Sequence, residues 1–437
     1  MDGWDMERRG GAVTQGRSWA ARAGDLLMFA VVAVSFYQKS NPGQNQPVPF
    51  DILLVAAMAV YFLFGLKLPR GMVWPAVLWG LILAGYGIGG MAAAYLDRVE
   101  NFMPAAAYLV CAMIFFAAYV YEEPERRLKL IFNAYTVAAV IAAFFGVGGY
   151  LGFLPNADSY LDFGRATGTF NDPNVFGPFL IAPAIYLSLR LSKAQSARAL
   201  FLAPLVCLLV LGILFSFSRG AWGNFLFSSA IFVGLSLATS RSPQQSLRLI
   251  IFSALMGLLV VAIVGVALST PKIQRLFTER AALVQDYDVG QQGRFESQKR
   301  AIVMSLERPL GIGPGQWGMV NKLDTHNVYL NVLVAGGFLS GLSFLTFLGV
   351  TFRRGGRAVL VAGPGQEYLI VLYACIVGHM AEAFIIDVDN WRHLFLLFGM
   401  AWGAILVAEQ ARGRASGAPP AIRRQPRIAE PADGFPA

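Results

Sequence analysis

The chain has little charge for its length. Only 14% of its 437 residues are Asp, Glu, Lys or Arg, whereas a soluble domain carries about a quarter. Hydrophobic residues make up 56%, and apolar runs recur from one end of the chain to the other. Many of these runs approach the ~20 residues that a helix needs to cross a bilayer core. The scarcity of charge therefore excludes a soluble globular protein and indicates a polytopic helical membrane protein.

Cysteine is scarce as well. Cys111, Cys207 and Cys375 all lie inside apolar runs, so their spacing matches neither a disulfide framework nor a metal site. The formal charge of +9 comes from basic residues in short loops between the apolar runs. They form no basic module interleaved with aromatic residues, and nucleic acid is therefore excluded as a partner. A compact signal with a cleavage site is also missing at the N-terminus, so residues 18–38 are expected to form a first, uncleaved span.

The apolar runs predict an all-α fold of about twelve transmembrane helices. The expected limits of these helices are 22–38, 50–66, 72–95, 102–121, 128–153, 175–191, 199–217, 221–238, 248–269, 327–351, 367–386 and 392–410. This gives four regions: residues 1–269 hold helices one to nine, 270–325 form a large loop, 326–410 hold helices ten to twelve, and 411–437 form a Pro/Ala/Arg-rich tail. We expect the tail to be disordered and cytoplasmic.

The distribution of Lys and Arg predicts the orientation. With the N-terminus inside, the inner segments hold 22 of these residues and the short outer loops hold five. This bias places both termini in the cytoplasm and the long 270–325 loop on the outer side. Within that loop, residues 270–287 and 293–309 are expected to form amphipathic helices. In the second helix, Phe295, Ile302, Val303 and Leu306 can share one face.

Four cationic or titratable residues fall on the predicted outer side. They are Arg165, Arg219, Arg294 and His326. A guanidinium group grips phosphate oxygens through a fork of donors and stays charged, and a histidine can accept a proton near neutral pH. Because no carboxylate cluster for a metal accompanies them, this set resembles a site that binds a lipid diphosphate and displaces it from a sugar carbon without Mg²⁺.

Each of these residues also has a purely structural interpretation. Arg165 can pair with Asp162 or Asp172, Arg219 can anchor a span at the interface, and Arg294 can be a solvated arginine. His326 can be the neighbour of a helix cap, and Asn174 of the "NDPN" turn can cap the following span. His379 and Glu382 lie one turn apart and form either an intramembrane relay or a helix–helix hydrogen bond.

Several blocks of sequence resemble the O-antigen ligase and polymerase superfamily. They are "GRATGTFNDPNVFG" (164–177), "FSFSRGAW" (215–222), "GRFESQKRAIVMSLERPLGIGPGQW" (293–317) and "THNVYLNVLVAGGFLSG" (325–341). Members of the superfamily are bacterial inner-membrane glycosyltransferases of the broad GT-C class that use glycans linked to undecaprenyl diphosphate. The resemblance extends from about residue 160 to residue 345, and the earlier spans match only as apolar sequence.

The resemblance implies roles for individual residues. Arg219 and Arg294 would contact the diphosphate, and His326 would assist the acceptor hydroxyl. Substrate contacts would come from Arg165, Asn174, Arg300, Asn327 and Arg392. "FESQ" follows Arg294 where the family has a tryptophan, so Arg300 or Arg308 is the alternative loop arginine. "DVDNWRHLFLLFG" (387–399) adds His393 beside Arg392 at the outer face.

The resemblance also implies a reaction. The expected protein transfers a glycan from undecaprenyl diphosphate to a hydroxyl of lipid A-core, as an O-antigen ligase does, in the inner membrane and with its site facing the periplasm. It requires no metal or other cofactor. The alternative is an O-antigen or exopolysaccharide polymerase with a lipid-linked repeat unit as acceptor. A twelve-helix secondary transporter is the alternative from another class, which the scarcity of acidic residues in the spans disfavours; a structural scaffold subunit is a further alternative.

Overall fold

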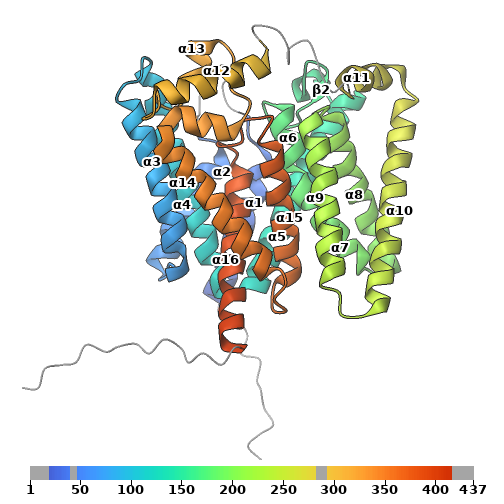
Figure 1. The fold of residues 1–437 in the computed structure, drawn as a ribbon. Helices are drawn as coiled ribbons and strands as arrows, with labels where there is room; N and C mark the ends of the chain where they lie inside the picture. The colour runs from blue at the N-terminus through green and yellow to red at the C-terminus, as the bar shows by residue number, and fades with distance from the viewer. Residues whose placement is uncertain (1–18, 40–46, 282–292, 416–437) are drawn as a thin grey trace, which may run out of the picture.

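The computed structural model describes residues 19–39, 47–281 and 293–415. In this part of the chain the regular structure is helical apart from a two-residue antiparallel ladder, in which Asp162 of β1 (Leu161–Asp162) pairs with Arg165 of β2 (Arg165–Ala166). Most of the α-helices stand side by side as one bundle, and a few lie across one end of it (Figure 1). The described chain has sixteen α-helices. They are α1 (Trp19–Ala33), α2 (Pro49–Leu63), α3 (Val73–Gly90), α4 (Leu96–Glu122), α5 (Pro124–Leu151), α6 (Pro173–Phe179), α7 (Ile181–Ser192), α8 (Ser196–Phe215), α9 (Arg219–Ala238), α10 (Pro243–Leu268), α11 (Pro271–Ala281), α12 (Arg294–Glu307), α13 (Trp317–Asn321), α14 (Val328–Ala358), α15 (Gln366–Glu382) and α16 (Arg392–Ala415). Short 3-10 helices are η1 (Val34–Phe36), η2 (Arg70–Met72) and η3 (Ala157–Tyr160).

The structure confirms an all-α membrane protein. Ten helical segments of the described chain are long and apolar enough to cross a membrane. Each of the twelve expected spans coincides with a helix or a pair of helices, and the two that are too short for that criterion are α2, with 15 residues, and α15, with 17. The boundaries differ by several residues in places, because polar residues such as those at the start of α4 continue a helix beyond its apolar run.

The expected span 175–191 is broken into α6 and α7. Pro183 has no backbone N–H, so it cannot donate to the carbonyl of Phe179, four residues earlier. The hydroxyl of Tyr135 on α5 donates to that carbonyl at 2.8 Å instead. A side chain from a neighbouring helix thus satisfies a backbone group that lipid could not satisfy.

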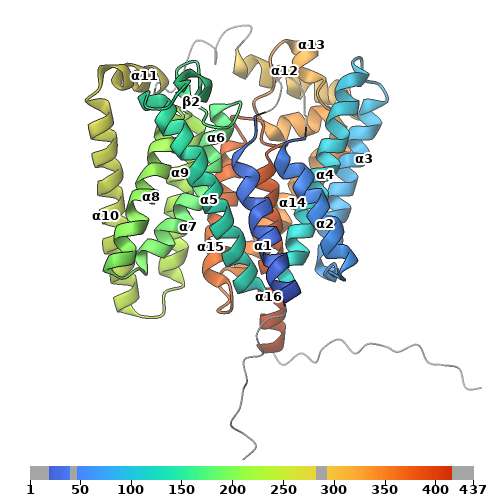
Figure 2. The same cartoon turned by 180° about the vertical axis from the view of Figure 1, so that it is seen from behind.

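Packing is unequal across the bundle. Helix α16 lies directly against α4, where a Cβ added to Gly399 would be 2.5 Å from the carbonyl oxygen of Met113. Small residues let the two backbones approach closely, as is usual between membrane helices. By contrast, Ala267 is the one buried residue of α10, and Figures 1 and 2 show α10 at the edge of the bundle. Most of α10 therefore faces the surrounding lipid.

The two ends of the bundle carry different elements. Helices α11, α12 and α13 and strand β2 lie at one end (Figure 1), which we call the loop end. Helix α1 begins at the opposite end, where α16 also ends (Figure 2). The first and the last helix therefore place the two ends of the helical region at the same end of the bundle. Helix α16 continues to Ala415, past the expected start of the tail at residue 411, and residues 416–437 lie outside the described part.

The expected amphipathic helices 270–287 and 293–309 correspond to α11 and α12, and residues 282–287 of the first lie outside the described part of the chain. On α12 the predicted apolar face exists, but it is exposed: Ile302 is 50% exposed and Leu306 is 68% exposed. The buried face consists of Ser297, Ala301 and Ser305. Small side chains let α12 lie close to α14, which explains why this face rather than the apolar one is covered.

Helix α14 is interrupted at Gly336 and Gly337, where the backbone leaves helical conformation. The segment 309–313, which we call the strap, fills the break. The amide N–H groups of Ile312 and Gly313 donate to the carbonyls of Val334 and Ala335, both at 2.9 Å, and Phe338 donates to Pro309 at 2.9 Å. Gly337 has φ +64°, and a Cβ there would lie 2.2 Å from the Pro309 oxygen. The strap and α14 are thus joined through their backbones, which gives "GIGPG" a structural role.

Candidate functional site

A cavity of about 750 Å³ opens at the loop end. Five of the residues singled out in the sequence line it, although they come from four separate segments of the chain. These residues are Arg165, Asn174, Arg219, Arg294 and His326. Arg165 and His326 are 161 positions apart in the sequence, yet the five side chains line one cavity. We therefore take this cavity as the candidate site.

Three long helices begin at this cavity. Arg219 is the first residue of α9, Arg294 is the first residue of α12, and His326 directly precedes Asn327, the N-cap of α14. The N-terminus of a helix carries a partial positive charge and unpaired N–H groups. The helix ends and the guanidinium groups therefore add up to a site that favours an anion.

The turn before Arg219 is held tightly. Phe217 has φ +45°, in the left-handed region that non-glycine residues seldom adopt. The hydroxyl of Ser218 caps α9 by accepting from the N–H of Ala221 at 3.3 Å, and the indole N–H of Trp222 donates to the carbonyl of Ile213 at 3.1 Å. Such strain persists only where the surroundings enforce it, so the start of α9 and with it Arg219 have a fixed position.

Arg165 contributes to this fixed position. Its Nε donates to the carbonyl of Ser216 at 2.9 Å, and its Nη2 donates to Oδ1 of Asn174 at 2.8 Å. The N–H of Asn174 in turn donates to Asp172, the N-cap of α6, at 2.7 Å. Arg165 thus ties the "NDPN" turn to the turn that carries Arg219, while its side chain still borders the cavity.

His326 is held by an aspartate that the sequence reasoning missed. His326 has φ +46°, and its backbone N–H donates to Oδ2 of Asp387 at 3.0 Å. Oδ1 of Asp387 accepts from Thr325 and from the N–H of Asn327, each at 2.9 Å. Burial raises the pKa of the Asp387 carboxyl, and the hydrogen bond from Thr325 and the nearby His326 oppose that shift. The acidic pair in "DVDN", at the outer end of a predicted span, was the available signal.

Further residues complete the lining. Arg280, at the end of α11, adds a cation that the sequence reasoning did not single out, and α11 is held against α9 by the stacked rings of Phe277 and Trp222, 5.1 Å apart. Asp172, Asp324, Asp387 and Glu382 also border the cavity. The site is therefore a mixture of arginines and carboxylates rather than a uniformly positive pocket.

Glu382 has the helix–helix contact that was the simpler interpretation. Its Oε2 accepts from the side-chain amide of Asn224 on α9 at 2.7 Å, whereas Nδ1 of His379 contacts the carbonyl of Cys375 at 2.7 Å. In addition, Gly220 lies against the Glu382 carboxylate so closely that a Cβ would be 2.6 Å away. The contact thus joins α15 to the start of α9.

Three expected substrate-binding residues lie outside the cavity lining. Arg300 is on the exposed side of α12. Asn327 is an N-cap, whose side chain accepts from the N–H of Leu330 at 3.2 Å. Arg392 forms an ion pair with Asp51 at 2.7 Å that joins α16 to α2. Helix capping and long-range ion pairing therefore account for Asn327 and Arg392, and the alternative loop arginine Arg308 is likewise exposed and outside the lining. His393, the neighbour of Arg392, is buried against Trp391.

The described part of the chain offers no set of side chains suited to ligate a metal ion. No group of three or more His, Cys, Asp or Glu side chains there is arranged to hold a metal ion. The cations that the cavity offers come from the protein itself.

The helices and this cavity define a multi-pass membrane protein with a polar site at one end of its bundle. A family model described as O-Antigen ligase matches residues 204–345. The matched segment contains Arg219, Arg294 and His326, and it supports the assignment of the chain to the O-antigen ligase and polymerase superfamily with a function of that type. No curated protein matches the chain.

Proposed function

We propose that this protein is a glycosyltransferase of the bacterial inner membrane that moves a glycan from undecaprenyl diphosphate to an acceptor hydroxyl. We assign it to the O-antigen ligase type, with lipid A-core as acceptor, both termini in the cytoplasm and the cavity facing the periplasm. The main support is the meeting of Arg219, Arg294 and His326 at three helix N-termini around one cavity. The family match covers the same three residues.

The arginines provide the chemistry for the leaving group. A diphosphate that separates from a sugar gains negative charge as the bond breaks, and fixed donors aimed at that charge stabilise the transition state. Arg219 and Arg294 are the first residues of their helices, so the partial positive charge of each helix N-terminus adds to the charge of its arginine. Arg165 keeps the turn before Arg219 in place through Ser216. The preorganised donors replace the metal ion that many diphosphate-using enzymes need.

His326 provides the chemistry for the acceptor. The bond between the anomeric carbon of the glycan and the diphosphate oxygen breaks, and its electron pair leaves with undecaprenyl diphosphate. The acceptor hydroxyl oxygen forms the new bond to that carbon, and its proton passes to the imidazole of His326. Asp387 accepts from the Thr325 hydroxyl and from the backbone N–H groups of His326 and Asn327, and it thereby positions the imidazole.

The acceptor distinguishes the two members of this reaction class. A polymerase would use the same cavity with a lipid-linked repeat unit in place of lipid A-core. The family match supports the shared transfer reaction, and it weighs against the secondary-transporter alternative.

A deletion strain tests the proposal directly. We expect lipopolysaccharide without attached O-antigen and an accumulation of long glycan on undecaprenyl diphosphate. Single repeat units on the lipid would instead indicate the polymerase, and an unchanged glycan profile would refute both. With purified protein we expect transfer to continue in EDTA; loss of transfer that Mg²⁺ restores would contradict the role given to the arginines.

A further inference from the structure

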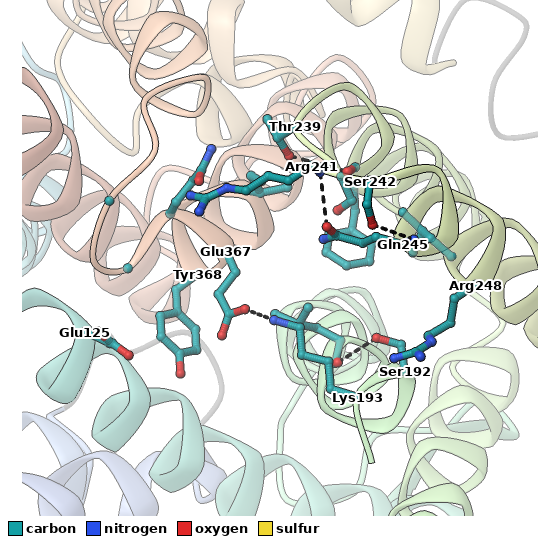
Figure 3. A pocket seen from close by; sticks show the side chains of 18 of the residues that line it. Glu125, Ser192, Lys193, Thr239, Arg241, Ser242, Gln245, Arg248, Glu367 and Tyr368 are labelled. Carbon is teal, nitrogen blue, oxygen red and sulfur yellow. Dashed lines mark hydrogen bonds and ion pairs between the residues drawn. The ribbon is translucent and has the colours of Figure 1, made fainter. Parts of the chain in front are cut away.

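A second cavity, of about 670 Å³, lies at the end of the bundle opposite the loop end. It is bordered by the last residues of α7, the turn between α9 and α10, the start of α10, and the segment that leads into α15. The labelled side chains of Arg241, Arg248, Lys193 and Glu367 surround this space in Figure 3. No residue of the proposed transfer site contributes to it.

The cavity is polar and carries two arginines available for an anion. Lys193 forms an ion pair with Glu367, but within the described chain no carboxylate pairs with the side chain of Arg241 or Arg248. The hydroxyl of Ser242 and the side-chain amides of Gln244 and Gln245 share the lining, whereas the hydroxyls of Ser192 and Thr239 donate to the carbonyls of Leu189 and Leu235. Guanidinium groups together with such donors are suited to a phosphate.

An apolar groove of about 460 Å³ continues from this cavity along α10. Ser192, Gln244 and Arg248 border both spaces, so the polar cavity and the groove adjoin each other. The groove is lined by Leu191, Leu247, Ile251, Phe252 and Leu255. From Gln244 to Leu255 the helix rises by about 16 Å, which is about half of the ~30 Å hydrocarbon core and equals one leaflet.

The position of the groove favours a lipid as its occupant. Leu247, Ile251 and Leu255 are 58%, 51% and 59% exposed, and they belong to a helix that faces the surrounding lipid along most of its length. A phosphate group at the membrane surface with an apolar chain below it matches the order of the two spaces. Basic pockets between membrane helices are known to bind anionic headgroups in this way.

We propose that this cavity and groove bind one anionic phospholipid of the adjoining leaflet. Its phosphate lies between Arg241 and Arg248, and one acyl chain lies along α10 from Leu247 to Leu255. The charge bias predicts that this leaflet is the cytoplasmic one. The lipid is therefore a different molecule from the donor at the loop end, and the inference holds whether or not glycan transfer is the activity.

Lipid retention by the intact protein tests this inference. Purified full-length protein is placed in nanodiscs that contain equal amounts of phosphatidylglycerol and phosphatidylcholine with the same acyl chains. The lipids that stay bound after release are counted by native mass spectrometry. We expect wild-type protein to retain phosphatidylglycerol selectively. The double variant Arg241→Gln/Arg248→Gln should retain roughly 30-fold less, from the loss of two basic groups near the membrane surface.

The matched control is Arg353→Gln/Arg357→Gln. These two arginines are exposed near the end of α14, at the same end of the bundle, and their loss removes the same charge without touching the cavity. Retention should stay at the wild-type level. Equal loss in both double variants, or wild-type protein that retains the two lipids equally, would overturn the proposal.

A second pair of variants tests the groove. Leu255→Trp places an indole in the groove, whereas Leu258→Trp adds the same group at a position that is 66% exposed and outside the lining. We expect the first variant to lose bound lipid and the second to keep it. Equal retention in the two variants would refute the assigned acyl path. Displacement of the lipid by glycerol 3-phosphate at the lipid's own concentration would show a site for soluble phosphates instead.

Discussion

The two ends of this molecule use arginine in different ways. At the loop end, Arg165 is anchored by Ser216 and Asn174, and Arg219 follows a strained turn and starts a helix. At the opposite end, Arg241 and Arg248 are exposed side chains that line the second cavity, and Arg248 also borders the apolar groove. A reaction needs its charges held in place before the substrate arrives. Retaining a lipid headgroup needs only charge near the membrane surface. The held arginines of the loop end therefore suit a reaction, and the exposed arginines of the opposite end suit the binding of a headgroup.

The largest expected effect comes from His326, which has no counterpart at the opposite end. His326→Ala should lower the rate of glycan transfer by ~10²–10⁴-fold, because it removes the group that accepts the proton. Donor binding should change little. Turnover and donor binding are measured with purified protein and a lipid-diphosphate donor, with Arg353→Gln as the unaffected control. If the variant turns over normally, His326 has only a structural role beside the N-cap of α14.

A pair of lysine substitutions sharpens the contrast between fixed and loose arginines. Arg219→Lys keeps the charge but loses the fork of donors, so donor affinity should fall roughly 10- to 100-fold, as for a lost hydrogen bond to a charged group. Arg248→Lys should retain phosphatidylglycerol within about twofold, because lysine also binds phosphate as a point charge. If Arg248→Lys lost phosphatidylglycerol as strongly as Arg219→Lys lost donor affinity, the two ends of the molecule would not differ in how they use arginine.

Asp387 should have an intermediate effect. In Asp387→Asn the amide keeps one oxygen for Thr325 and Asn327 but directs an NH₂ group at the N–H of His326. The lost charged hydrogen bond is worth ~1.5–3 kcal/mol, and if about 1.4 kcal/mol of it positions the imidazole in the transition state, kcat should fall roughly tenfold with little change in donor affinity. Kinetics of Asp97→Asn, an exposed carboxylate, provide the control. If kcat is unaltered in Asp387→Asn, the hydrogen bonds of Asp387 are not needed to position His326 for the reaction.

The smallest expected effect is a pH dependence at the loop end. Burial and the nearby Asp387 raise the pKa of Asp389 to about 7, above the ~3.9 of an unfolded aspartate. The folded state thus binds the proton more tightly, and the resulting stability is fully present below about pH 4 and lost as the pH rises through 7. The thermal midpoint of unfolding should therefore fall between about pH 4 and pH 7 because of this group. Asp389→Asn should flatten that fall, whereas Asp97→Asn should preserve it; an identical pH profile in both variants would refute the assignment.

Much of the helical framework could be predicted from sequence, because apolar runs of membrane length have few alternatives. Local signals also located the turns that carry Arg165, Arg219 and His326. The partners of these turns are distant in sequence: Asp387 is 61 residues from His326, and Asp51 is 341 residues from Arg392. Hydropathy and motif spacing carry no information about such pairs. This is why the Asp51 partner of Arg392 was not foreseen and why Asp387 was missed, whereas the capping contact of Asn327 with Leu330 is local.

The covered face of α12 illustrates the same limit. Periodicity identified the apolar face with Ile302 and Leu306, and the usual expectation is that such a face is buried. In the structure the buried face holds Ser297, Ala301 and Ser305. Close backbone approach decided the packing, and it depends on the shape of α14, which includes an irregular break at two glycines.

The strap across the break in α14 has a consequence for biosynthesis. Residues 309–313 precede α14 in the chain, so the ribosome has already made them when α14 enters the membrane. Once α14 is inserted, the carbonyls of Val334 and Ala335 and the N–H of Phe338 can be paired by a segment that has already been synthesised. A chain that started after Gly313 would have to insert α14 with these three groups unpaired, at ~1–3 kcal/mol each. Because the strap is synthesised before α14, it is available when the break in α14 needs hydrogen-bond partners.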